Sequence, residues 1–556
     1  MLINLKMKRH LKNPIFYLAV IFLLTLFLRL PSVTTPFLDV DEGINAVIGN
    51  TILNGGIPYR DAIDNRGPVG YYIYALIFFL FGKNNMMAIH LALIFLVSII
   101  SIILYLICTL IGNKKMAYWV ILFFAVFSCS YTPRQMLSFN AEWCALIFSV
   151  IGAYLFLRFI FKEKYLFLFL SGLSFGLAFF AKQPSLFDFM AALLFCCFFV
   201  YSNKKSIKPL VKAATTMIVG FSTVIIIFVC YFYLKNALND FWFWSWAYYT
   251  KYYVPGRSIC EKLAGTILQL IYSFNGGNFL LYIFFITASL ITVFRFFNKS
   301  KKVDKEIIID FYLLFWCLFS YLGAAYSGRN FGHYFIMILP PFCIVAGRTL
   351  QILFDTFNFY IKSSKDKYPR CTSEIYNIKI FIIVVVISGI IFSLAKYTYE
   401  IDTRRFYLGQ KTREIPYMNM PQTIFPLTEY IKQNSNEHEK ILAWGFVPEI
   451  YILSNRMPAS RHFYSNFLTG FMFGATEIDT SKYFFSRTWE IFMREIRNNM
   501  PIFIVDASVG EYFYYGKYPL SKYKELFVFL NENYIIDKDF VDKKGKLSFR
   551  LYKRIK

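Results

Sequence analysis

A long polar loop between two apolar segments holds the residues best suited to chemistry. It runs from residue 31 to residue 68 and contains the acids Asp39, Asp41, Glu42, Asp61 and Asp64 and the arginines Arg60 and Arg66. Acidic side chains held close together beside a bilayer repel one another, so clustering them is costly. The cluster therefore indicates acid–base chemistry or cation binding more than packing. A loop that is polar only because it is solvated is the alternative interpretation.

The composition is typical of a polytopic α-helical membrane protein. Of the 556 residues, 57% are hydrophobic and 21% are aromatic, with 65 Phe, and apolar runs of about 18 residues or more recur along the chain. The net charge of +25 comes from Lys and Arg in short clusters between these runs. Clusters so placed are topology signals, so no nucleic-acid partner is expected. The ten cysteines lie mostly inside apolar runs and predict no disulfide framework.

Eleven membrane-spanning helices are expected, and the first is a retained helix rather than a cleaved signal peptide. Their ranges are 14–30, 86–111, 116–131, 140–161, 165–181, 184–202, 210–234, 278–297, 307–326, 331–353 and 378–396. The apolar segment 69–82 is too short to cross comfortably and is predicted to lie along the outer face.

Charge supports this arrangement. If 69–82 does not cross, the loops on the side of the N-terminus carry 23 Lys and Arg. The opposite loops, at 31–68, 132–139, 182, 235–277 and 327–330, carry nine. The positive-inside rule then predicts a cytoplasmic N-terminus and an extracytoplasmic acidic loop in the plasma (inner) membrane. Everything after residue 396 is expected on the extracytoplasmic side.

Two further regions differ from the helical bundle. The loop 235–277 is rich in Trp and Tyr, which predicts an interfacial helix at headgroup depth, with a sugar or lipid platform as the alternative. Residues 397–556 read as a small α/β domain, with strands at 440–444, 501–505, 534–540 and 547–552 and helices at 423–433 and 482–498. The predicted domains are therefore 1–396, which includes the first external loop with its juxtamembrane helices (31–85), and 397–556.

Four more polar residues interrupt apolar sequence on the predicted outer side. They are Glu142, Lys182, Arg329 and His333. A lone charged residue at a helix end usually reaches the interface and has no further role. Together at one face, acids and cations predict a site for an anionic, partly lipidic substrate.

These motifs, in this order, resemble those of family 39 (GT-C type) glycosyltransferases. That family includes protein O-mannosyltransferases, an aminoarabinose transferase acting on lipid A and bacterial galacturonosyltransferase relatives. The resemblance rests on Asp41-Glu42, on Arg66-Gly67-Pro68, on the segment from Arg329 through His333-Tyr334 to Pro340-Pro341, and on Trp444-Gly445, Pro448-Glu449 and Asn455-Arg456 in the tail. The family commonly has Lys-Pro-Pro where this chain has Arg66-Gly67-Pro68.

The resemblance implies a role for each matching position. Asp41 matches the catalytic aspartate, with Glu42 beside it, and Arg66 takes the place of a phosphate-contacting lysine. Glu142 matches the acidic residue of the second external loop. Substrate binding is further expected of Tyr59, Arg60, Lys182, Arg329 and His333.

The implied reaction transfers a sugar from a polyprenyl-phosphate donor. A carboxylate takes the proton of the acceptor hydroxyl and cations stabilise the departing phosphate. Asp41 is the predicted base, and it is placed at the N-cap of a helix. One carboxylate base with no covalent intermediate predicts inversion at the anomeric carbon.

The sequence leaves several alternatives open. The acceptor can be a glycan, a lipid or a protein, and the sugar is not specified. No cofactor is required, although a divalent metal is possible. A transporter or flippase for a lipid-linked sugar would also need buried charges, but no related halves are visible. A structural or sensor protein would leave the acidic loop unexplained.

Overall fold

A computed structural model describes residues 14–248, 258, 260–261, 264–265, 268, 278–298, 305–328, 331–364, 369–401, 422–471 and 486–555. These residues form two compact units. Unit 1 comprises those within 1–32, 90–227 and 258–411, and unit 2 comprises those within 33–89, 228–257 and 412–556. Unit 2 thus combines the tail with parts of the acidic and aromatic loops, whereas the predicted boundary at residue 396 follows chain order and stays a prediction.

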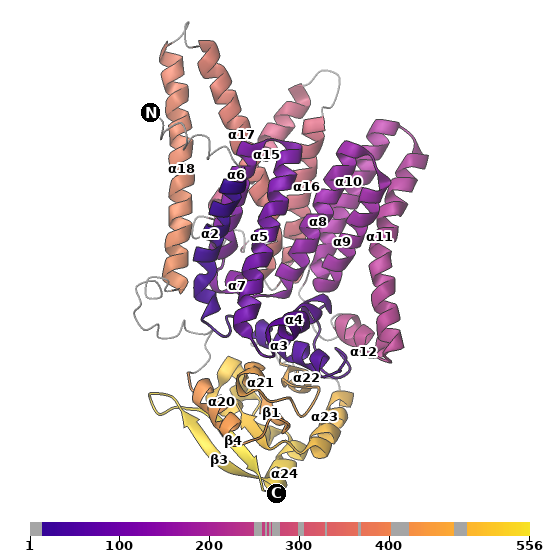
Figure 1. The fold of residues 1–556 in the computed structure, drawn as a ribbon, viewed down its shortest axis with the longest axis vertical. Coiled ribbons are helices and arrows are strands. Elements are labelled where there is room, and N and C mark those ends of the chain that lie inside the picture. Colours follow the sequence, from indigo (N-terminus) through magenta and orange to yellow (C-terminus); the bar gives the residue numbers. More distant parts are fainter. Residues whose placement is uncertain are drawn as a thin grey trace. The chain divides into compact units, whose positions relative to one another are not determined.

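The long helices follow the predicted apolar runs (Figure 1). They are α2 (Pro14–Val33), α5 (Met86–Ile111), α6 (Lys114–Ser130), α8 (Ala141–Lys162), α9 (Tyr165–Ala181), α10 (Leu186–Lys204), α11 (Ile207–Leu234), α15 (Phe279–Asn298), α16 (Lys305–Ala325), α17 (Leu339–Ser364) and α18 (Pro369–Ile401). Within the described residues, nine helical segments are long and apolar enough to cross a membrane. The remaining two of the predicted eleven, α6 and α9, have 17 residues each. The chain is a multi-pass membrane protein.

Shorter elements connect these helices in unit 1. They are α7 (Pro133–Leu137), η1 (Gln183–Ser185) and η4 (Gly332–Ile338), a 3₁₀ turn that leads into α17. Helices α8 and α9 pack side by side, and the Ser171 hydroxyl donates to the Gly152 carbonyl at 2.8 Å. Gly172 of α9 lies so close to α11 that a Cβ there would be 2.9 Å from the backbone nitrogen of Phe221. Small residues permit this close approach, which is a common way for helices to associate in a bilayer.

Unit 2 begins with two short helices from the first loop. Helix α3 (Val40–Leu53) follows the acidic cluster, and α4 (Val69–Phe81) is the apolar segment that was predicted not to cross. With 13 residues, α4 is about 20 Å long, which is less than the ~30 Å apolar core of a bilayer. The predicted short helix is therefore confirmed, and it packs against α3.

The tail forms the predicted α/β fold. Its strands are β1 (Ile441–Trp444), β2 (Phe503–Asp506), β3 (Tyr534–Val541) and β4 (Leu547–Arg554), in the order β1-β2-β4-β3. Strands β1 and β2 are parallel, with Ile441 opposite Phe503, and the other pairs are antiparallel. The helices of the tail are α20 (Ile424–Gln433), α21 (Glu449–Ser454), α22 (Asn466–Thr469), α23 (Ser486–Asn499) and α24 (Lys524–Asn533), with short 3₁₀ turns between β2 and α24.

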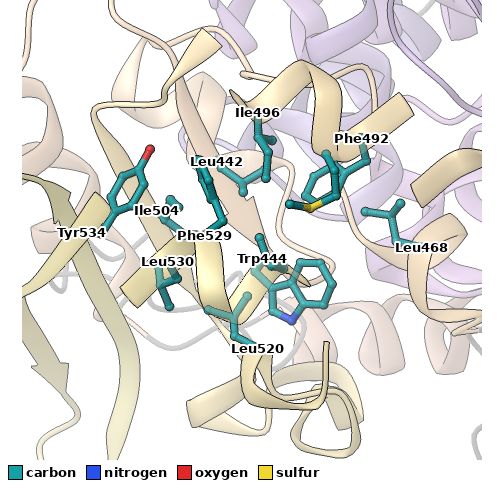
Figure 2. Close-up of a cluster of buried hydrophobic side chains, with 12 residues drawn as sticks. Leu442, Trp444, Leu468, Phe492, Ile496, Ile504, Leu520, Phe529, Leu530 and Tyr534 are labelled. Carbon is teal, nitrogen blue, oxygen red and sulfur yellow. The ribbon is translucent and has the colours of Figure 1, made fainter. Parts of the chain in front are cut away.

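One apolar cluster holds the sheet and helices of the tail together (Figure 2). Trp444 of β1 is fully buried, and its ring lies 6.4 Å from that of Phe492 in α23. Side chains of β2, α22 and α24 complete the cluster. Burying a large apolar side chain contributes about 1.5–3 kcal/mol, so this cluster accounts for a stable tail fold.

Part of the aromatic loop packs inside unit 2, whereas Trp242 is 63% exposed, and its place at a membrane interface stays a prediction. Its described part forms α12 (Leu238–Trp242) and one turn of π-helix (η2, Phe243–Ala247). Helix formation was expected, but Phe241, Trp244 and Tyr248 are buried. Trp244 and Tyr248 lie 4.9 and 5.1 Å from the ring of Phe467 in the tail. These three side chains therefore pack in the core of unit 2. The sequence did not predict this, because aromatic composition alone does not distinguish a protein core from a membrane interface.

Candidate active site

The acidic loop turns into α3 through a capped start. Asp39 is the N-cap, and its carboxylate accepts the backbone N–H of Asp41 at 3.1 Å. Glu42 lies in the first turn, where its carboxylate accepts the N–H of Leu38 at 2.8 Å. The two acids thus satisfy N–H groups that the helix start leaves without partners. The prediction that Asp41 is the N-cap is wrong, because the extended backbone that a cap needs occurs at Asp39, at φ −144° and ψ 146°.

Asp41 instead pairs with the arginine that the sequence singled out. The Nη2 of Arg66 donates to Oδ1 of Asp41, and the two side chains keep 16% and 12% of their surface exposed. Both groups are therefore held in place yet remain in reach of a ligand. Burial disfavours the charge of Arg66, but Asp41 and Asp64 outweigh it and raise the pKa of Arg66 well above its ordinary value. The guanidinium is a permanent cation.

Asp64 is the second carboxylate on the same guanidinium. Its Oδ2 accepts from Nη1 of Arg66 at 3.1 Å and from the hydroxyl of Tyr71 at 2.5 Å. Its Oδ1 accepts from the hydroxyl of Tyr464 at 2.7 Å. The sequence placed Asp64 in the acidic cluster without a role, although its position two residues before Arg66 was an available signal. Tyr464 is 400 residues away along the chain, and no local pattern could have indicated it.

Tyr59 and Arg60 both form contacts within unit 2, although the side chain of Arg60 remains 35% exposed. The hydroxyl of Tyr59 donates to the carbonyl of Arg66 at 2.6 Å, and the residue is completely buried. Its φ of +70° is a strained conformation for a bulky side chain and costs about 1–3 kcal/mol. Arg60 forms an ion pair with Asp61 at 2.7 Å and donates to the carbonyl of Lys235 at 2.8 Å. Tyr59 thus fixes the backbone at Arg66, whereas Arg60 ties the loop to the residue after α11.

Unit 1 contains a second polar cluster. Lys182, which precedes η1, lies 2.8 Å from Glu142 in the first turn of α8, and its ammonium is 4.9 Å from the centre of the Tyr334 ring. His333 of η4 places Nε2 4.0 Å from the same Glu142 carboxylate. The predicted residues Glu142, Lys182 and His333 therefore come together. Arg329, which was expected beside them, lies outside the described residues.

Metal ligation has no support in the described part of the chain, where no group of three or more His, Cys, Asp or Glu side chains is placed to hold an ion. Nine of the ten cysteines have side chains that the structure describes, and these nine are free thiols.

Further contacts, besides that of Tyr464 with Asp64, join the tail to the first loop within unit 2. The N–H of Ile63 donates to the carbonyl of Arg461 at 3.0 Å. The amide of Asn84 donates to that of Asn455 at 2.7 Å. Helix α3 also packs against the start of α21, where a Cβ at Gly43 would lie 3.0 Å from Cγ of Glu449. Tail positions in the motifs Pro448-Glu449 and Asn455-Arg456 thus lie against the loop that carries Asp41.

Comparisons with known proteins agree with the resemblance in the sequence. Residues 65–227 match the family model described as dolichyl-phosphate-mannose-protein mannosyltransferase. This stretch contains Arg66, Glu142 and Lys182, whereas Asp41 lies upstream of it. No curated protein matches the chain.

Solved structures share the fold over nearly the whole chain. ArnT from Cupriavidus metallidurans bound to undecaprenyl phosphate is 12% identical with a TM-score of 0.56, and the match covers 97% of each chain. The archaeal oligosaccharyltransferase AglB from Archaeoglobus fulgidus, in complex with an inhibitory peptide and a dolichol-phosphate, is 12% identical with a TM-score of 0.53. That match covers 98% of this chain and 74% of AglB.

The helical bundle with its mixed-sheet tail is the fold of these GT-C type membrane glycosyltransferases, and residues 65–227 match a glycosyltransferase family model. The fold predicted from the sequence is confirmed, and the family match agrees with the resemblance.

Proposed function

We propose that the chain moves a sugar from a polyprenyl-phosphate donor to an acceptor hydroxyl on the extracytoplasmic face, with inversion at the anomeric carbon. The ion pair between Asp41 and Arg66 carries this proposal, since it places a base and a permanent cation side by side at a partly exposed position. The relatives support the donor class, because their structures were solved with undecaprenyl phosphate and with dolichol-phosphate.

The chemistry follows from what each group can do. The acceptor oxygen attacks the anomeric carbon, the bond from that carbon to the phosphate oxygen breaks, and the acceptor proton passes to the carboxylate of Asp41. The products are the glycosylated acceptor and the polyprenyl phosphate. Arg66 stabilises the negative charge that develops on the departing phosphate. A guanidinium suits this role because its N–H groups are arranged in a fork that fits phosphate oxygens.

The cluster in unit 1 has a separate proposed role. Lys182 is a cation beside Glu142, and cations near acids bind anionic substrates. We assign Glu142, Lys182 and His333 to substrate binding and leave the proton transfer to Asp41. The aromatic face of Tyr334 gives Lys182 further support through a cation–π contact.

The experiment uses membranes that contain the full chain and a panel of labelled polyprenyl-phosphate sugars. We expect one donor to lose its label to a membrane glycan, lipid or protein, and the product to have the opposite anomeric configuration. An Asp41→Asn variant at the same expression level should transfer nothing measurable. Transfer by neither protein with any donor would contradict the proposal, and movement of the intact donor across the bilayer would support a flippase instead.

A further inference from the structure

Asp64 is a buried carboxylate that is completely surrounded by protein. It is 1% exposed and accepts hydrogen bonds from Arg66, Tyr71 and Tyr464. Burying a carboxylate without partners is costly, so its three donors are what make its charge tolerable there. They also fix its orientation, because Oδ2 takes Arg66 and Tyr71 while Oδ1 takes Tyr464.

Tyr464 reaches Asp64 from the tail and is rigid. Its side chain is buried, and its ring packs 4.9 Å from Phe463, 5.2 Å from Phe467 and 5.5 Å from Phe446. Burial, followed by the charge of Asp64, raises the pKa of Tyr464 well above its ordinary value. The hydroxyl therefore stays protonated near neutral pH and donates to Asp64.

The guanidinium of Arg66 is divided between two carboxylates. Nη1 contacts Asp64 and Nη2 contacts Asp41. A fixed Asp64 therefore determines where the guanidinium lies and how much of its charge acts on Asp41. Asp64 and Arg66 are two residues apart in the loop, whereas Tyr464 comes from the tail.

We propose that Tyr464 is a positioning residue for sugar transfer, which fixes Asp64 and through it the place and charge of Arg66 beside Asp41. The inference rests on the proposed function. In this role the tail takes part in the reaction, because Tyr464 acts on Arg66 through Asp64.

Anchoring the tail is the competing explanation of the contact. Other groups already do this, since the N–H of Ile63 and the amide of Asn84 bond to the tail. The ring of Tyr464 also packs well without its hydroxyl. The hydroxyl alone is therefore the group to test, and Tyr464→Phe removes it while keeping the aromatic contacts.

The test compares four variants with the wild-type protein in membranes, using the labelled polyprenyl-phosphate sugar that the wild type transfers. They are Tyr464→Phe, Asp64→Asn, the double variant, and Tyr534→Phe as a control. Tyr534 is a buried tyrosine of the tail whose hydroxyl donates to the carbonyl of Pro501 at 2.8 Å. It matches Tyr464 in chemistry but has its partner inside the tail.

We expect Tyr464→Phe to lower kcat about tenfold, as the loss of one aimed hydrogen bond does, with little change in KM. In the Asp64→Asn variant, adding Tyr464→Phe should lower kcat no further, because Tyr464 acts through Asp64. Tyr534→Phe should keep the wild-type kcat. Equal losses for Tyr464→Phe in both backgrounds, or wild-type kcat for Tyr464→Phe, would overturn the inference.

Either of these two outcomes would leave the proposed function intact. A wild-type protein that transfers no sugar from any donor would overturn both.

Discussion

At the scale of single residues, one guanidinium organises the site. Arg66 contacts Asp41 and Asp64, and its backbone carbonyl accepts the hydroxyl of Tyr59. The remaining acids have other tasks, since Asp39 and Glu42 accept backbone N–H groups at the start of α3. Among the three acids at the start of α3, Asp41 is thus the one that pairs with a cation and keeps part of its side chain exposed. Substitutions at Asp41, Asp39 and Arg66 test these assignments.

Asp41→Asn should fold normally and lose transfer by orders of magnitude. Asparagine keeps the shape and can still contact Arg66 through its amide oxygen, but it cannot take a proton. Asp39→Asn should cost far less activity, because asparagine is as good an N-cap as aspartate. Initial rates of label transfer at equal protein levels check both. Near-normal transfer by a folded Asp41→Asn protein would end the assignment.

Arg66→Lys should retain partial activity, whereas Arg66→Ala should lose most of it. Lysine still presents a positive charge to phosphate, although without the fork of the guanidinium. Alanine removes the cation and leaves two carboxylates facing each other, which also weakens the fold. Loss of one aimed cation costs about 3 kcal/mol of transition-state stabilisation, or about a hundredfold in rate. Rates and thermal stability should be measured together, and normal turnover by Arg66→Ala would make the residue an ordinary interfacial arginine.

The stability of the α3 start should depend on pH through Asp39. Burial, followed by the neighbouring charge of Asp41, raises the pKa of Asp39 well above its ordinary value. A carboxyl with a raised pKa in the folded state stabilises the fold at low pH, and this contribution is lost as the pH rises through the folded-state pKa. Asp39→Asn removes that dependence. In detergent, the difference between the Tm of Asp39→Asn and that of the wild type should increase in favour of the variant as the pH rises. Plots of Tm against pH that run parallel for the two proteins would contradict this.

At the scale of elements, helices were predictable and caps were not. Apolar runs of sufficient length specify α5 or α8 because a bilayer leaves few alternatives for the backbone. The N-cap depends on dihedral angles that neighbouring acids do not encode, so it lies at Asp39 rather than Asp41. The β1 and β2 strands of the tail were also recognisable, because each is a short apolar run between polar turns.

Gly43 of α3 packs against α21, and an alanine at this position would have two opposing effects on stability. Alanine favours a helix over glycine by about 1 kcal/mol. At position 43, however, its Cβ would lie 3.0 Å from Cγ of Glu449 and 3.1 Å from Cγ of Pro448, and overpacking costs about 1–3 kcal/mol. Gly43→Ala should therefore lower the Tm and, because Asp41 lies half a turn away, reduce transfer as well. A higher Tm with full activity would mean that helix propensity dominates.

At the scale of the whole molecule, residues distant in the sequence build the site of unit 2. Asp41 and Arg66 could be proposed from their types and from the family resemblance, since both belong to one loop. Tyr464 could not be proposed from the sequence, because its partner Asp64 is 400 residues away along the chain. Many other tyrosines of the tail would have been equally plausible partners. The burial of Trp244 escaped prediction for a similar reason, as its neighbour Phe467 belongs to the tail.

The orientation in the membrane is the prediction that belongs to the molecule as a whole. We expect a cytoplasmic N-terminus and an extracytoplasmic tail, because 23 Lys and Arg lie in the loops on the side of the N-terminus and ten, with Lys83 included, in the opposite loops. This count depends on α4 not crossing, and its 13 residues are too few to do so comfortably. Reporter fusions after residue 400 should therefore behave as exported, and a fusion before α2 as cytoplasmic. A cytoplasmic signal from the fusion after residue 400 would mean that the number of crossings is even, and would move the tail with Tyr464 to the inner side.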